Sequence, residues 1–413
     1  MTTAAPYLPV DTLHLWYLGQ PEQPTRVGSL HLVMGGRGVS LRYAPDWLRQ
    51  GFALSEDLPL IDREHLPTEK DNAAGAVDDA RPDRWGERVI RLLHRPPRLS
   101  LLELLYFTGD DRFGALGVSS SPDQYLPHAT SALPQLGDAQ ALHTLVRRVQ
   151  QGAPVLETER RLIAPGATMG GARPKALVEI EGQSWVLKFG DETGSHEGLL
   201  EHASLTLAAL AGIRVATTRP VPLASGTALA IERFDRAPGQ RLHALSAHVA
   251  LRAAGSEPGY PALAQLLRRR GVVTDGWWQH DMHELFRRLV FNILIDNTDD
   301  HEKNHVLLVQ DNQQLRLSPA FDVLPTGQAL GYQSMHVGKD GAVSSVDNAL
   351  SMAAMYGLSA REALGEARRV ARVLDGWQDH FHSLGVSAAA AALLADQVDR
   401  PFLREQRRAL LAA

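Results

Sequence analysis

The chain has 413 residues, which is enough for about two or three domains. Its 44% apolar and 22% charged residues are ordinary for a globular protein with buried cores, and the absence of cysteine excludes disulfide scaffolds and thiolate metal sites. The net charge of −5 provides no overall basic field that would draw the chain onto nucleic acid. We expect no membrane span, no signal peptide and a cytoplasmic location.

The first part of the chain predicts a small β-rich unit. Short apolar runs between residues 12 and 43 are broken by Gly and Pro, which is typical of short strands joined by turns. The segment ARPDRWGERVIRLLHR, at 80–95, has a Pro-Asp entry and then a helical pattern, and a second helical stretch begins near residue 99. Residues 120–137 are rich in Ser and Pro and predict a connection.

A second β region begins near residue 158 and contains a glycine loop. The sequence GATMGGARPK is followed by ALVEI and WVLKF, which predicts a hairpin around an EGQS turn. It has neither the G-K-[ST] of a Walker loop nor the G-x-G-x-x-G of a dinucleotide fold. A Gly-rich turn followed by a strand lysine is the arrangement of a protein-kinase nucleotide site, where Lys188 would reach the α and β phosphates. The alternative, a tight turn and a surface lysine, stays open on this pattern alone.

The region after the glycine loop predicts a helix, a hairpin and then mostly helices. HEGLLEHASLTLAALAGI is apolar at helical spacing and is closed by Gly212; its carboxylates Glu201 and Glu197 are the candidate partners of Lys188, with Glu201 preferred. TTRPVPLASGTALAIERFD resembles a hairpin, and so does HVLLVQDNQQLRLSPAFD at 305–322. The last 50 residues predict Ala-rich helix with a cap at Ser387.

The letters His301-Glu302-Lys303-Asn304-His305 spell H-E-x-x-H, the pattern of zinc proteases. Upstream lies an amphipathic helix, for which Asn297 is a plausible left-handed stop. Its apolar face comprises residues 282, 285, 286, 289, 290, 293 and 294. A strand-like run begins at Val306, so the letters fall in a loop where the two histidines would not share a helical face. We therefore disfavour zinc, although Asp322 could be imagined as a third ligand.

The same letters contain a second spacing, because Asp299 and Asn304 match the D-x-x-x-x-N of a kinase catalytic loop. In that loop the Asp accepts or orients the proton of the attacking hydroxyl and the Asn holds Mg²⁺, and Asp322 in SPAFDVLP stands where a second metal-binding carboxylate belongs. Asp300 is one residue out of register, which makes it a neighbour. Lys303 either contacts the γ-phosphate, balances the carboxylates, or is an exposed turn lysine. The order of these motifs favours a kinase.

Together these stretches resemble the HipA-type serine/threonine kinases, the toxins of bacterial toxin–antitoxin pairs. The matching segments are TMGGARPKA, VLKF, LAALAGI followed by IERFDR, NTDDHEKN and PAFDVLPT, while ARPDRWGERVI resembles the tract that closes the family's N-terminal subdomain. The resemblance implies an α+β, bilobal protein-kinase-like fold with an N-terminal β-rich subdomain and a largely helical C-lobe. We expect the N-terminal subdomain at 1–110, a connecting segment at 111–155, the kinase N-lobe with the glycine loop at 156–240, and the helical C-lobe at 241–413.

The resemblance also implies roles for individual residues. Asp299 would be the catalytic base, Asn304 and Asp322 would bind Mg²⁺, and Lys188 would bind the phosphates of ATP. The other expected ATP contacts are Gly170, Gly171, Ala172, Arg173, Pro174 and Lys175 in the glycine loop, Glu232, Arg233 and Phe234 beside the adenine, His301, Glu302 and Lys303 along the phosphates, and Phe321. Thr168 matches a loop hydroxyl that family members phosphorylate to switch themselves off; the alternative is a simple turn residue.

By resemblance, the expected activity is transfer of the γ-phosphoryl group of ATP to a Ser or Thr of a translation-related protein, possibly an aminoacyl-tRNA synthetase. Such a toxin arrests growth and is neutralised by a small helix-turn-helix antitoxin (HipB-like), so that contact with DNA would be only indirect. Two alternatives stay open. One is a small-molecule kinase of the aminoglycoside phosphotransferase type, which shares the D-x-x-x-x-N logic, and the other is a kinase-shaped corepressor that binds ATP without turnover.

Overall fold

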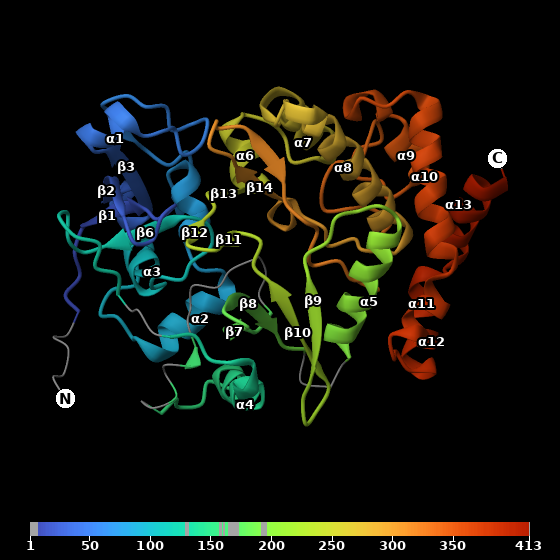
Figure 1. Ribbon diagram of the computed structural model, residues 1–413, viewed down its shortest axis with the longest axis horizontal. Coiled ribbons are helices and arrows are strands. Elements are labelled where there is room, and N and C mark those ends of the chain that lie inside the picture. Colours follow the sequence, from blue (N-terminus) through green and yellow to red (C-terminus); the bar gives the residue numbers. More distant parts are fainter. Residues whose placement is uncertain are drawn as a thin grey trace. The chain divides into compact units, whose positions relative to one another are not determined.

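The computed structural model describes residues 7–128, 132–156, 159, 162–163, 173–190 and 196–412. The chain divides into two compact units (Figure 1), of which unit 1 comprises Met1–Phe189 and Asp235–Leu245, and unit 2 comprises Gly190–Phe234 and Ser246–Ala413. Among the described residues, no helix combines the length and the apolar character that a membrane crossing requires.

Unit 1 begins with a six-stranded sheet in the order β4-β3-β2-β1-β6, with β5 paired to β3. All of its neighbours are antiparallel except β3 and β5. Its strands are β1 (Thr12–Tyr17), β2 (Thr25–Val33), β3 (Gly38–Tyr43), β4 (Glu64–His65), β5 (Asn72–Ala73) and β6 (Leu116–Ser119). Alternate residues such as Leu13 and Leu15 are fully buried, as period-2 patterning requires. The β-rich start expected from the sequence is confirmed.

Unit 1 also contains a hairpin and several α-helices. The helices are α1 (Pro45–Gln50), α2 (Arg84–Leu93), α3 (Leu101–Phe107) and α4 (Ala139–Gln150), of which α3 contacts β1, β2, β3 and β6. The hairpin predicted around the EGQS turn is present as β7 (Lys175–Ile180) and β8 (Gln183–Lys188). The short strands β11 (Arg236–Ala237) and β12 (Gln240–Arg241) also belong to unit 1, and β13 (Ala244–Ser246) spans its boundary. The strand expected near residue 158 falls largely outside the described residues.

Unit 2 contains two hairpins and most of the helices. The hairpins are β9 (Thr218–Pro222) with β10 (Thr227–Glu232), and β14 (Val306–Val309) with β15 (Leu315–Leu317), both as predicted. The helices are α5 (Glu197–Leu210), α6 (Ala247–Ala253), α7 (Tyr260–Arg270), α8 (Trp277–Leu294), α9 (Val346–Leu350), α10 (Ala360–Asp375), α11 (Trp377–Ser383), α12 (Ala388–Val398) and α13 (Pro401–Ala412). The predicted cap of α12 is confirmed, because the side chain of Ser387 accepts from the Ala390 N–H.

Helix α8 forms the core of unit 2 and contacts α7, α9, α10 and α13 (Figure 1). All seven residues of its predicted apolar face are completely buried. The prediction that Asn297 is its left-handed stop was wrong by one residue, because Asp296 carries the left-handed backbone, with φ of 63°. The side chain of Asn297 is instead held by a 3.1 Å hydrogen bond to Asn292 Oδ1, which draws it back against the helix.

Candidate active site

The H-E-x-x-H letters lie in a loop between α8 and β14, as predicted. Only Glu302–Asn304 form a turn of 3-10 helix (η6), with His301 and His305 in extended conformation on either side. The two histidines therefore do not share a helical face. Among the described residues, no group of three His, Asp or Glu side chains is placed to hold a metal ion. The loop therefore lacks the helical arrangement of two histidines that binds zinc in a zinc protease.

The two adjacent aspartates of this loop have opposite environments. Asp299 is exposed, whereas Asp300 is 2% exposed. The Asp300 carboxylate accepts hydrogen bonds from the Tyr260 hydroxyl and, at 2.7 Å, from His305 Nε2. Burial alone would raise the pKa of Asp300, but His305 and Tyr260 together hold that pKa below its ordinary value. Asp300 is thus held inside the protein by its hydrogen bonds, and Asp299 is the carboxylate that is exposed to solvent.

Sequence reasoning missed the polar network that extends from Asp300. Asn292 Nδ2 donates to the Tyr260 hydroxyl at 3.2 Å, and Asn292 Oδ1 accepts from Asn297. These groups are all buried, where hydrogen bonds between polar side chains are stronger than in water and help to fix the arrangement of the chain. The one available signal was Asn292 itself, a polar residue inside an otherwise apolar stretch of helix. The network holds both ends of the loop that displays Asp299.

Asn304 and Asp322 provide oxygen atoms suited to Mg²⁺. Asn304 is buried, and its Oδ1 has no hydrogen-bond partner among the described residues, while its amide nitrogen lies 3.5 Å from the Asp299 carbonyl. Asp322 is half-buried and has a left-handed backbone, with φ of 57°. An unsatisfied buried amide oxygen is costly unless a ligand uses it, and a non-glycine residue with positive φ is a recurrent feature of functional sites. Two protein oxygens, completed by phosphate and water, are a usual donor set for Mg²⁺.

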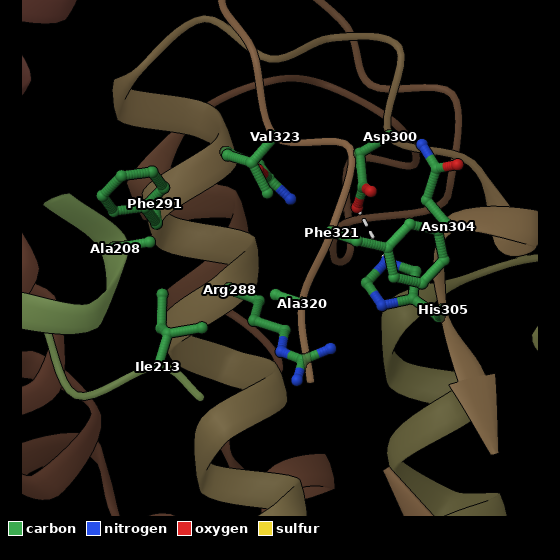
Figure 2. A pocket seen from close by; sticks show the side chains of 11 residues that line it. Ala208, Ile213, Arg288, Phe291, Asp300, Asn304, His305, Ala320, Phe321 and Val323 are labelled. Atoms are coloured by element: carbon green, nitrogen blue, oxygen red, sulfur yellow. Dashed lines mark hydrogen bonds and ion pairs between the residues drawn. The ribbon is translucent and has the colours of Figure 1, made fainter. Parts of the chain in front are cut away.

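Residues of the loop between α8 and β14 and of the segment before Asp322 line one narrow pocket (Figure 2). Asp300, Asn304 and His305 line it, together with Phe321 and the buried Arg288. Its volume of about 10 Å³ admits roughly one water molecule, so it is an internal packing gap and not the site of a nucleotide. Figure 2 shows Asn304 beside the hydrogen-bonded Asp300 and His305. The two predicted Mg²⁺ ligands therefore belong to segments that adjoin in unit 2.

The residues expected beside the adenine lie at the end of β10, also in unit 2. Phe234 is half-buried, and its ring centroid lies 5.5 Å from that of Phe321. Arg233 is buried and Glu232 is half-buried. The structure thus brings Phe234 and Phe321, two predicted ATP contacts, into one aromatic pair.

The residues expected along the phosphates divide between loop and hairpin. In the loop between α8 and β14, His301 and Glu302 are half-buried and Lys303 is exposed. In unit 1, Lys188 on β8 is only 6% exposed, which contradicts the interpretation of Lys188 as a surface residue. The Pro174 carbonyl accepts a hydrogen bond from the Phe189 N–H at 3.0 Å. This bond continues the β7–β8 pairing by one residue beyond Lys175 and Lys188.

Other predicted site residues lie outside the described residues or in a different unit from the loop between α8 and β14. Thr168, Gly170, Gly171 and Ala172 lie outside the described residues, and Arg173 is half-buried where the description resumes. Glu201, on α5, is buried, whereas Glu197 is half-buried. Because Lys188 belongs to unit 1 and its expected neighbours Glu201, Asp299, Asn304 and Asp322 belong to unit 2, their convergence stays a prediction.

The fold and the loop geometry define the class: an α+β protein of protein-kinase-like architecture. A family model described as the HipA-like C-terminal domain matches residues 167–377, and another described as the HipA N-terminal domain matches residues 22–119. The chain belongs to the HipA family.

This chain is also similar to individual proteins and solved structures. The protein named "Putative kinase Y4dM" of Sinorhizobium fredii (strain NBRC 101917 / NGR234) is 30% identical over 243 residues, which cover 54% of this chain and 57% of that protein. A chain from the structure of the Shewanella oneidensis MR-1 toxin–antitoxin system of HipA, HipB and its operator DNA superposes with a TM-score of 0.63 at 18% identity, covering 97% of this chain and 96% of that one. This likeness establishes the fold. The Helicobacter pylori proinflammatory kinase CtkA gives a TM-score of 0.45 at 14% identity, covering 59% and 92% of the two chains.

Proposed function

We propose that this protein is an ATP-dependent protein kinase that transfers the γ-phosphoryl group of ATP to a Ser or Thr hydroxyl. The observation that carries the proposal is the different environment of Asp299, Asp300 and Asn304 in the loop between α8 and β14. Asp300 is buried and hydrogen-bonded, and this leaves Asp299 exposed at the first position of D-x-x-x-x-N, while Asn304 at the last position keeps an unused oxygen. Family membership and the name of the Sinorhizobium relative support the same conclusion.

The proposed roles follow from the chemistry of each side chain. Asp299 accepts or orients the proton of the attacking hydroxyl, and Asn304 Oδ1 with the Asp322 carboxylate holds Mg²⁺. Mg²⁺, when bound, neutralises charge on the phosphoryl group that is transferred. Lys188 holds the phosphates as a point charge, with Glu201 as its partner, and Phe234 lies on the adenine side. Catalysis comes mainly from positioning and from fixed charges in a preorganised site.

The biological role that we propose is that of a growth-arresting toxin. Its target would be a translation-related protein, possibly an aminoacyl-tRNA synthetase, and its neutralising partner would be a small helix-turn-helix antitoxin. The support is family membership and the fold shared with a chain of the HipA, HipB and operator DNA complex. A short helix-turn-helix reading frame beside this gene, whose product co-purifies with this chain, is the expected finding.

The test is phosphoryl transfer from radiolabelled Mg·ATP into a bacterial lysate, followed by mass spectrometry of the labelled species. We expect phosphoserine or phosphothreonine peptides with the wild-type chain. Asp299→Asn should lower the rate by about 10²–10⁴-fold, the usual contribution of a general base, and Asp322→Asn should also abolish transfer. Asp311→Asn is the matched control, because Asp311 is an exposed carboxylate in the β14–β15 turn of the same unit.

The outcomes separate the alternatives. An unchanged rate in Asp299→Asn contradicts the assignment of the base. Phosphorylated metabolites without phosphopeptides indicate a small-molecule kinase, and binding of Mg·ATP without any turnover indicates a corepressor. Either of these last two results overturns the proposed protein kinase.

A further inference from the structure

Two lysines face each other across the β7–β8 hairpin. The Cα atoms of Lys175 and Lys188 are register partners, and the two side chains are 1% and 6% exposed. Side chains directly opposite on an antiparallel pair lie on the same face, with Cβ atoms about 5 Å apart, and like charges there are destabilising. Two buried ammonium groups in this position each need a carboxylate or another anion.

Helix α2 supplies the anion for Lys175. Lys175 Nζ lies 2.5 Å from Asp83 Oδ2, and this carboxylate is itself only 11% exposed. The second oxygen of Asp83 accepts the Gly86 N–H at 2.8 Å and thereby caps the N-terminus of α2. One carboxylate therefore starts the helix and neutralises the lysine.

The same helix turn also holds the backbone of Lys175. The buried indole of Trp85 donates from Nε1 to the Lys175 carbonyl at 2.8 Å. A shift of β7 by one residue would break both contacts and would move every side chain of the strand to the opposite face. The register of β7 with β8, and with it the position of Lys188, is therefore fixed from α2.

We propose that Lys175, paired with Asp83, is a positioning residue for Lys188 and not a ligand of the ATP phosphates. The pair fixes the position of β7 and cancels the positive charge that lies opposite Lys188. This assignment rests on the proposed kinase function, in which Lys188 holds ATP. Asp83 and Trp85 belong to the HipA N-terminal domain. In this proposal, that domain therefore helps to position the β7–β8 hairpin, which binds the nucleotide.

The decisive experiment compares the KM for ATP of Lys175→Met, Asp83→Asn and the double variant. In Lys175→Met the unpaired Asp83 carboxylate competes for Lys188, so KM should rise by about 10- to 100-fold, as small misplacements of a catalytic group typically cost. The double variant removes that carboxylate and should recover most of the loss. Asp83→Asn keeps a capping side chain on α2, and its KM should rise because the charge opposite Lys188 is no longer cancelled.

Lys70→Met is the matched control, since Lys70 is an exposed lysine of unit 1. If Lys175 contacted phosphate directly, the double variant would recover nothing, and that result overturns the assignment. An unchanged KM in Asp83→Asn or in Lys175→Met, whatever the loss of thermal stability, overturns it too. Absence of any phosphoryl transfer by the wild-type chain would instead reject the proposed function itself. Should Lys175→Met fail to fold, Asp83→Asn decides the question.

Discussion

The neighbouring carboxylates Asp299 and Asp300 should respond in opposite ways to the same substitution. Asp300 accepts two hydrogen bonds at a buried, charged carboxylate, and each such bond contributes about 1.5–3 kcal/mol. We therefore expect Asp300→Asn to lower the free energy of unfolding by about 3–6 kcal/mol, or the melting temperature by about 6–24 °C for a unit of this size. Asp299 is exposed, so Asp299→Asn should change stability by less than about 0.5 kcal/mol while it lowers the rate of phosphoryl transfer by about 10²–10⁴-fold.

The assay is thermal unfolding of both variants, followed across pH, alongside the transfer rate. Because the pKa of Asp300 is held low in the folded state, its stabilisation is present above the ordinary carboxyl pKa of 3.8 and is lost as the pH falls through the folded value. The stability curves of wild type and Asp300→Asn should therefore converge below about pH 4. A melting temperature unchanged in Asp300→Asn, or lowered equally by Asp299→Asn, would refute the division of roles between the two residues.

Three further predictions concern stability. Burial lowers the pKa of His243 to about 4, so below pH 6.5 the unfolded chain binds a proton at this residue that the folded chain does not bind. His243 should therefore lower wild-type stability by up to about 3 kcal/mol between pH 6.5 and 4, and a pH series of urea melts should show a shallower acid slope in His243→Gln. Gly198→Ala should lower the melting temperature, at a cost of about 1–3 kcal/mol, because its Cβ would lie 2.5 Å from the Thr227 carbonyl oxygen, whereas Gly365→Ala, with open space around it in α10, should stabilise by about 0.5–1 kcal/mol. Ser387→Ala should cost about 0.5–2 kcal/mol by loss of the α12 cap, and Ser387→Gly only a few tenths, as measured by denaturant unfolding.

Each of these predictions has a result that contradicts it. An acid slope as steep in His243→Gln as in the wild type would show that His243 does not contribute to it. Equal effects of alanine at positions 198 and 365 would mean that close approach of the helix to β10 is not what requires glycine. A Ser387→Gly variant as unstable as Ser387→Ala would show that the hydroxyl does more than cap the helix.

The sequence by itself determined the local elements and the order of the motifs. The apolar spacing of residues 282–294 predicted α8 and its buried face. The hairpins around the EGQS turn and around Asp311 were predicted from strand-like apolar runs and from the turn residues between them. The H-E-x-x-H letters could be assigned to a loop for the same reason. These features depend on residues within a few positions of one another, and backbone periodicity expresses such short-range information directly.

Only the tertiary structure showed how the two members of each chemically similar pair differ in burial and in their partners. Asp299 and Asp300 differ because Tyr260, 40 residues away, reaches the second and not the first. Lys175 and Lys188 differ because Asp83, 92 residues from Lys175, takes the first. The charge and hydrogen-bonding capacity of each pair are nearly the same in the sequence. The members of each pair differ in burial and in partners that are distant in the sequence. A buried charge is costly unless it is paired, and only the fold determines which partner lies beside it.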